Sequence, residues 1–167
     1  MRHPILTTLA ALLLALGLSG AANAGPFEDA QVASDRGDHA TALRLWRPLA
    51  DQGHAGAQFH LGAMFANGRG VPQDDVQAVN WFRLAADQGL ASAQFSLGFG
   101  FANGRGVPQD DVHAVKWYRL AADQGHVDAQ FSLGLMYDTG QGVPQDHVQA
   151  VKWFRLAADQ GLAPPCQ

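Results

Sequence analysis

A unit of about 36 residues recurs along the chain, and this period restricts the possible folds more than any other feature. Three near copies start at Ala57, Ala93 and Ala129, each beginning Ala-Gln-Phe and ending Ala-Ala-Asp-Gln-Gly. A period of this length is typical of solenoids, in which each unit packs only on its neighbours. The sequence therefore predicts an elongated stack of repeats.

Each full unit reads as two helices joined by a loop. In the first unit Ala57, Leu61 and Phe65 recur every fourth residue, which places them on one face of a helix. Gly68 suits the left-handed position after the end of this helix, and the segment 69–73, with Gly70 and Pro72, predicts a loop. Asp74 then has the side chain of a helix N-cap, with a glutamine three residues on as in a capping box. A pair of this size leaves an apolar side open, so neighbouring pairs must stack.

A tryptophan recurs in the second half of every unit. Alanines and glycines are frequent around it and allow the helices to approach closely. We therefore predict that the four tryptophans fill space between helices and have a structural role: Trp46, Trp81, Trp117 and Trp153.

The repeat boundaries divide the chain into six segments. These are a signal peptide (1–24), an N-terminal capping half-repeat (25–53), three full repeats (54–89, 90–125 and 126–161) and a tail (162–167). The half-repeat keeps the second half of the unit but has a shortened connector around Gly37. The predicted fold class is all-α: an α-solenoid of stacked helix-turn-helix repeats with about eight helices after the signal peptide.

The first 24 residues predict export. A short basic start precedes the apolar stretch Ile5 to Leu18, and Ala22-Asn23-Ala24 resembles a signal-peptidase site. We expect the protein in the periplasm or secreted. No later apolar run has the ~20 residues of a membrane helix, so the sequence predicts no stable membrane anchor. The formal net charge of -4 becomes more negative when Arg2 is removed, which disfavours nucleic acid as a partner.

The motif of the unit resembles that of the Sel-1-like repeat family. From Gly53 to Gly161 the chain follows A-x-x-x-L-G-x-x-[FY]-x-x-G-x-G-V-x-x-D and then A-V-x-W-[FY]-x-x-A-A-x-x-G. The resemblance implies a right-handed superhelix, related to that of tetratricopeptide repeats, whose first helices line the concave face. It also implies an adaptor that binds a protein partner. Some exported, cysteine-rich relatives imply the alternative, a protein that binds or hydrolyses cell-wall fragments or β-lactams.

The positions that differ between the copies predict where a partner binds. On the first helices they recur at spacings of three and four residues, on a face other than the Ala57, Leu61, Phe65 stripe. We predict this face as the binding strip, with Phe99, Met64 and Met136 as anchors; relaxed selection on solvated positions is the alternative. The strip comprises His60, Ala63 and Met64 in the first repeat, Ser92, Ser96 and Phe99 in the second, and Asp128, Ser132, Leu135 and Met136 in the third.

Three phenylalanines recur beside the strip, at Phe59, Phe95 and Phe131. Stacked one repeat apart, they could form an aromatic ladder for an extended peptide or a glycan. Packing between adjacent repeats is the interpretation that we favour.

The sequence predicts neither an enzyme nor a metal or cofactor site. The seven histidines show no H-E-x-x-H pattern, and none of the serines belongs to a G-x-S-x-G or S-x-x-K motif. Cys166, the single cysteine, lies in the tail. A homodimer through the C-terminal end of the stack, with or without a Cys166 disulfide, is a further prediction.

Overall fold

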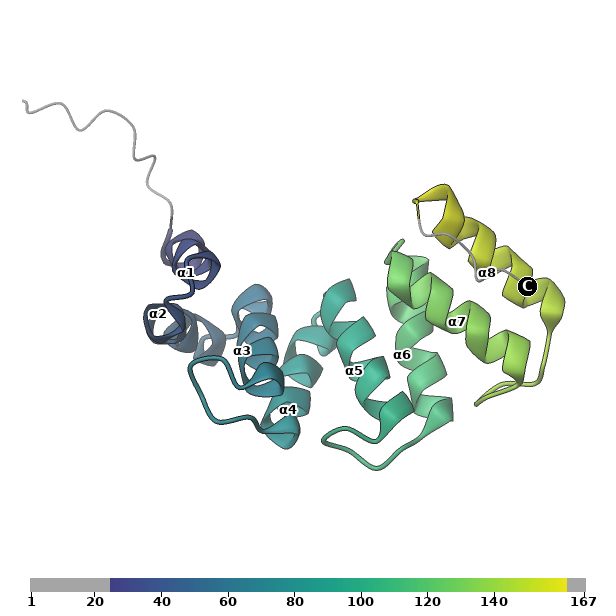
Figure 1. Cartoon of the computed structure of the whole chain (residues 1–167), viewed down its shortest axis with the longest axis horizontal. Coiled ribbons are helices and arrows are strands. Elements are labelled where there is room, and N and C mark those ends of the chain that lie inside the picture. The colour runs from purple at the N-terminus through teal and green to yellow at the C-terminus, as the bar shows by residue number, and fades with distance from the viewer. Residues whose placement is uncertain (1–24, 162–167) are drawn as a thin grey trace, which may run out of the picture.

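The computed structural model describes residues 25–161, and these residues form eight α-helices. The helices are α1 Pro26–Asp35, α2 His39–Asp51, α3 Ala55–Asn67, α4 Asp75–Asp87, α5 Ala91–Asn103, α6 Asp111–Asp123, α7 Val127–Thr139 and α8 His147–Asp159. Each helix packs on the next one along the chain, and the pairs follow one another in an arch (Figure 1). The predicted all-α stack of helix pairs is confirmed. The predicted signal peptide and tail lie outside the described residues.

The second helix of each full repeat begins at the predicted aspartate. The Asp74 carboxylate accepts a hydrogen bond from the Gln77 backbone N–H at 2.9 Å, and Asp110 and Asp146 repeat this N-cap. The capping box is only partly formed, because the Gln77 side chain donates to the Asp74 carboxylate. The Asp74 N–H donates instead to the carbonyl oxygen of Phe65 at 3.0 Å, which ties the loop back to α3.

The connectors of the second and third full repeats each contain a glycine at a position where a side chain would clash with backbone. Gly106 has φ +72°, and a Cβ there would overlap the carbonyl oxygen of Asp75 at the start of α4. Gly142 has the same relation to Asp111 at the start of α6. Each of these connectors therefore packs on the second helix of the preceding repeat and fixes the spacing between repeats.

The core of each full repeat contains an alanine and a leucine from the first helix. Leu61, Leu97 and Leu133 are completely buried, as are the alanines four residues before them. A glycine follows each leucine, and a Cβ on Gly62 would meet the ring of Phe82. The predicted apolar stripe of the first helices is confirmed, and its small residues let the second helix approach.

Trp46 differs from the other three tryptophans. The shared Ala-Asp-Gln-Gly ends align Trp46 with Phe82 of the next repeat, one position after Trp81. Trp46 is accordingly 1% exposed, whereas Trp81, Trp117 and Trp153 are half-buried. Its ring stacks on His60, with centroids 4.3 Å apart and planes 5° apart, and its Nε1 has no hydrogen-bond partner among the described residues. Trp46 belongs to an apolar core, and the other three tryptophans pack against the cores. Trp46 is the most deeply buried because it lies one position later in its unit than they do.

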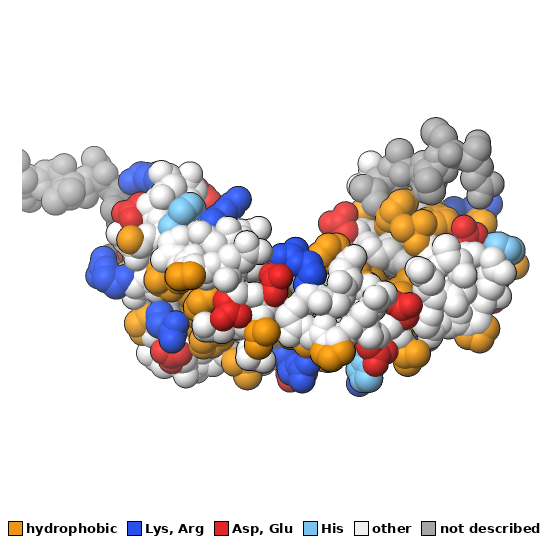
Figure 2. All heavy atoms as spheres, turned by 60° about the horizontal axis from the view of Figure 1, so that its bottom comes forward, with side chains coloured by type: hydrophobic (Ala, Val, Ile, Leu, Met, Phe, Trp, Pro, Cys, Tyr) orange, Lys and Arg blue, Asp and Glu red, His pale blue; other side chains and the backbone are white. Residues whose placement is uncertain are grey.

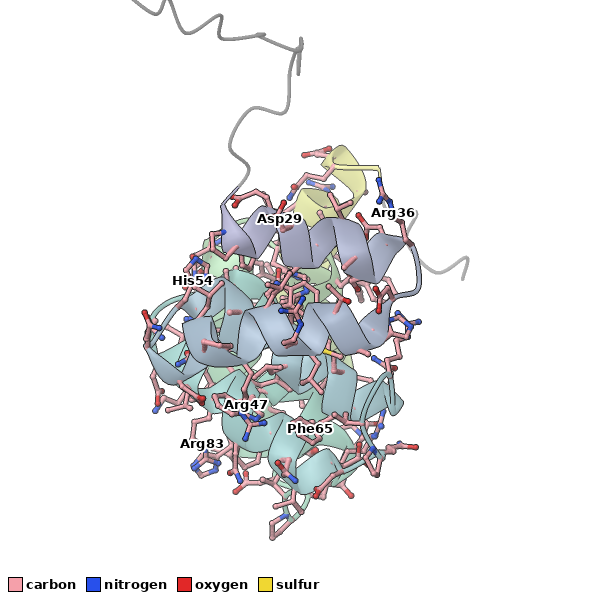
Figure 3. All side chains as sticks on the ribbon, turned by 90° about the vertical axis from the view of Figure 1, so that its left-hand side faces the viewer. Asp29, Arg36, Arg47, His54, Phe65 and Arg83 are labelled. Atoms are coloured by element: carbon pink, nitrogen blue, oxygen red, sulfur yellow. The ribbon has the colours of Figure 1, made fainter. Side chains whose placement is uncertain are left out.

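Helices α1 and α2 cover the first full repeat at one end of the arch (Figure 3). The guanidinium of Arg47, on α2, lies 5.7 Å from the ring centroid of Trp81 on α4. Among the described helices, none is long and apolar enough to cross a membrane.

Candidate functional site

An apolar pocket of about 320 Å³ lies between α3 and α5, with α4 as its floor. This volume is at the lower end of the range found for ligand pockets, which is roughly 300 to 1,000 Å³. We call the junction of α3 and α5 over α4 the first seam, and that of α5 and α7 over α6 the second seam. The pocket is lined by Phe59, Ala63, Ala66, Asn67, Asp75, Ala78, Val79, Phe82, Phe95, Ser96, Phe99, Gly100 and Arg105.

The pocket exists because the second repeat has glycine where its neighbours have methionine. Met64, Gly100 and Met136 occupy the same position of their first helices. Met64 is 4% exposed and Met136 is 5% exposed, and both side chains belong to apolar cores. Gly100 is also buried, but it has no side chain to fill the space beside Val79. The first seam therefore keeps open a space that methionine closes in the second seam.

The burial of Met64 and Met136 corrects the prediction that they anchor a partner. Their spacing places them next to the strip, but they lie on the side of the helix that packs against the preceding second helix. Both faces of α3 and α7 are apolar, so spacing alone does not distinguish a core position from a groove position. Met64 and Met136 are core residues.

Three of the predicted strip residues, Ala63, Ser96 and Phe99, meet at the pocket. Phe99 is 41% exposed, which is unusual for a phenylalanine beside a core, and Leu135 in the corresponding position of α7 is 38% exposed. Ala63 is the small residue at the same position of α3. The mouth of the pocket therefore has a large apolar side chain on the α5 side and a small one on the α3 side.

The two charged residues of the pocket wall neutralise each other. Arg105 Nη2 lies 2.8 Å from Asp75 Oδ1, and Nε adds a longer bond to Oδ2. The pair joins the connector of the second repeat to the start of α4. In the third repeat, Gln141 stands at the position of Arg105, so the second seam has no matching guanidinium at this position.

The remaining strip residues lie outside the pocket. The ring of His60 faces Trp46, and burial lowers the pKa of His60. Ser92 lies one turn before the pocket residue Ser96, and its carbonyl oxygen accepts a hydrogen bond from Ser96 Oγ at 2.9 Å. Burial raises the pKa of Tyr118 to about 12, an effect that a hydrogen bond with Ser132 partly offsets. Asp128, with Ser132 and Leu135, belongs to α7 and not to the pocket wall.

The repeated phenylalanines pack mainly within their own repeats. Phe59 lies against Phe82, Phe95 against Tyr118, and Phe131 against Phe154, with ring centroids 5.5 to 5.8 Å apart. The expected packing between repeats is seen for Phe95, which stacks on His126 at 4.8 Å. Phe59 and Phe95 also form the pocket wall, so the two serve both the core and the candidate site.

The sequence analysis missed a buried glutamine in each full repeat. Gln58 donates to the carbonyl oxygen of Ala50 at 3.1 Å and accepts from Gln88 Nε2 at 2.7 Å. Gln94 and Gln130 make the same two contacts one and two repeats later. These bonds link α2, α3 and α4 and the equivalent helices of the later repeats. The Ala-Gln-Phe start shared by the three units was the sequence signal that could have revealed the role of this glutamine. They position the helices that form the pocket.

The outer face of α8 is a second apolar surface. Val151 is exposed there, whereas Val79 and Val115 at the same position are buried by the following repeat. The homodimer through this end stays a prediction, and Cys166 lies outside the described residues. Across residues 25–161, no group of three or more metal-ligating side chains is arranged to hold an ion.

Consecutive helix pairs, joined by glutamine bonds and glycine connectors, define an α-solenoid. The chain belongs to the Sel1 repeat family: the family model, described as Sel1 repeat, matches residues 34–54, 55–90, 91–126 and 127–162. Among curated proteins, none matches the chain.

Solved structures with this fold come from several bacteria. One is c5321, a protective antigen of uropathogenic Escherichia coli displaying an SLR fold, with 41% identity and a TM-score of 0.79 over 82% of this chain. A Sel1 repeat protein from Oxalobacter formigenes shares 32% identity, with a TM-score of 0.78 over 81% of the chain. The chain spans 30% of the first protein and 56% of the second. Helicobacter pylori cysteine rich protein B, at 21% identity and a TM-score of 0.54, covers 84% of this chain, which spans 94% of that protein, and shares the fold alone.

Proposed function

We propose that this Sel1 repeat protein is an exported scaffold that holds a protein partner on its first-helix face, with the first seam as the main contact. The observation that carries the proposal is the exposed ring of Phe99 at the mouth of an apolar pocket. Aromatic side chains, phenylalanine among them, are enriched at protein interfaces, and a few residues that fill pockets carry most of the binding energy there. The proposal assigns no catalytic step to the chain.

The shape of the molecule supports this assignment. Figure 2 shows the arch hollowed between its two arms, so a partner segment can contact several helix pairs at once. The family's superhelix places the first helices on the concave side. Phe99 and Leu135 stand one repeat apart on those helices and offer two apolar contacts along one line.

Affinity capture tests the scaffold function. Immobilised wild-type protein and its Phe99→Ala variant are incubated with envelope extract and culture medium, and Leu84→Ala, altered at an exposed residue of α4, is the matched control. We expect one protein to be retained by wild type and by Leu84→Ala but lost from Phe99→Ala. Retention by all three, or by none, would contradict the proposal. Capture of nothing together with muropeptide binding or nitrocefin hydrolysis would replace the scaffold with a small-ligand function.

Export is tested separately by the N-terminus of the mature protein. The segment 1–24 supports a cleavable signal, with cleavage after Ala24. N-terminal sequencing of protein from the periplasm and the medium should give a chain that starts at Gly25. A chain that retains Met1 in the cytoplasmic fraction would overturn this part of the proposal.

A further inference from the structure

We infer that the pocket of the first seam receives one methionine side chain from a segment of the protein partner, an inference that rests on the proposed function. The neighbouring repeats indicate which side chain fits this space. In the two neighbouring repeats, a methionine fills the position that Gly100 leaves empty. A partner methionine entering from the groove would restore the packing that those repeats already have.

The surroundings of Met64 show how far such a side chain reaches. A Cβ built on Gly70 would lie 3.1 Å from Met64 Cε and 2.9 Å from the Cβ of His39, so the methyl end of Met64 lies near the start of α2. One repeat later, the equivalents of Gly70 and His39 are Gly106 and Asp75. Asp75 is part of the pocket wall. The pocket therefore reaches the start of α4 at Asp75, the equivalent of the residue near which the Met64 side chain ends, while Gly106 packs on the Asp75 carbonyl beside it.

The wall chemistry favours a flexible, uncharged side chain. Four phenylalanine rings, Phe59, Phe82, Phe95 and Phe99, line the pocket. A polarisable thioether makes favourable contacts with aromatic rings. The charges of Asp75 and Arg105 are already paired with each other. A lysine or glutamate side chain would lose its hydration in this pocket without gaining a counter-charge.

The mouth allows a polypeptide backbone to approach. On the α3 side, the pocket residues include Ala63 and Ala66, which are partly exposed and whose short side chains leave the helix surface accessible. On the α5 side, Phe99 stands partly in solvent and can cover the entering residue. This arrangement suits a single side chain inserted from a segment that crosses the groove.

Dansyl-labelled pentapeptides Ala-Ala-Xaa-Ala-Ala test the inference, with methionine, norleucine, alanine or lysine as Xaa. Fluorescence anisotropy is measured with the whole chain as wild type, Gly100→Met, Phe99→Ala and the control Leu84→Ala. We expect wild type and Leu84→Ala to bind the methionine and norleucine peptides about tenfold more tightly than the alanine and lysine peptides. Gly100→Met fills the pocket from inside and should abolish this preference, and Phe99→Ala should weaken it.

Far-UV circular dichroism of Gly100→Met confirms that the variant is folded, and Phe99→Ala tests the pocket independently because its side chain is partly exposed. No binding of any peptide to wild type, equal binding of all four, or an unchanged preference in Gly100→Met would overturn the inference. Gly100→Met in the capture experiment separates the two proposals. A partner retained equally by wild type and Gly100→Met would support the scaffold and overturn the methionine pocket. Selective peptide binding without a captured partner would support the methionine-selective pocket and overturn the scaffold.

Discussion

The two seams have nearly the same sequence but differ at the core position that Gly100 occupies in α5 and Met136 in α7. In the second seam, Met136 fills the space beside Val115, and Leu135 stands on the groove face. In the first seam, Gly100 leaves that space open beside Val79, and Phe99 stands over it. The comparison teaches that a repeat scaffold gains a pocket by the loss of one side chain, with every helix kept in place.

This loss is unfavourable for folding, which supports a role for the open seam. Glycine inside a helix costs about 1 kcal/mol relative to alanine, and an unfilled core position loses further packing. Positions at which a sequence departs from good local packing are concentrated at functional sites. The second seam, in which Met136 fills the corresponding position, serves as the internal control for the first.

The largest expected effect comes from opening the second seam. Met136→Ala removes a buried side chain and should lower the free energy of unfolding by about 2 to 5 kcal/mol. Leu135→Ala, at the adjacent groove position, should lower it by less than about 1 kcal/mol because Leu135 is partly exposed. Urea denaturation measures both. Equal losses would show that Met136 is not the residue that closes the second seam.

Closing the first seam should raise the free energy of unfolding, whereas opening the second seam lowers it. Gly100→Met should raise the free energy of unfolding by about 1 to 3 kcal/mol, through helix propensity and added burial. A Cβ at this position would lie 3.3 Å from both Val79 Cγ2 and the carbonyl oxygen of Arg105, so these neighbours must shift by a few tenths of an ångström. The second seam accommodates Met136 beside the corresponding valine. A lower midpoint in urea than that of wild type would mean that the first seam cannot close as the second one does.

Acidification should destabilise the second seam more than the first. This effect should be smaller than those of the two substitutions above. His126 caps α7 by accepting from the Ala129 N–H at 3.3 Å, whereas Leu90 holds this position in α5. Burial lowers the pKa of His126 from its usual 6.5, and the charge of Asp128 opposes this only in part. Because the unfolded chain takes up the proton first, this contribution to stability is complete above pH 6.5 and is lost as the pH falls through the lowered pKa.

His126→Leu makes the second seam resemble the first and tests this pH dependence. Denaturation midpoints of wild type and variant are compared at about pH 7.5 and about pH 5, where other histidines contribute to both proteins alike. The decrease on acidification should be smaller in the variant. An identical decrease in both proteins would assign the pH dependence to groups other than His126.

The smallest effect is expected for the ion pair at the pocket. Arg105→Gln introduces the residue that the third repeat has at this position, and both partners of the pair are partly exposed. We expect a loss of about 0.2 to 1 kcal/mol at low ionic strength that shrinks in high salt. A loss of several kcal/mol, independent of salt, would show that the pair is a structural part of the first seam.

The local structure could be predicted almost completely from the sequence. Glycine after the first helix and aspartate before the second restrict the backbone strongly, and the structure has both at the predicted residues Gly68 and Asp74. The tryptophan spacing alone does not show that Trp46 is buried more deeply than the other three, whereas the aligned ends of the units reveal its shift of one residue.

The pocket could be predicted only in part. Variation among the repeats singled out Phe99, Ala63 and Ser96, which do meet at its mouth. The same variation marked Met64 and Met136, which are buried, because both sides of the first helix carry apolar residues. Whether such a side chain faces the groove or the preceding helix depends on how adjacent pairs pack, which periodicity within one helix does not contain.

Site-specific photo-cross-linking tests most directly whether the open seam is where the partner binds. Benzoylphenylalanine is placed at position 99, at position 135 of the closed seam, or at position 84 on α4, and each protein is irradiated with envelope extract and culture medium. We predict one dominant cross-linked product from position 99, a weaker one from position 135 and none from position 84. Equal products from all three positions, or a product from position 84 alone, would contradict the account.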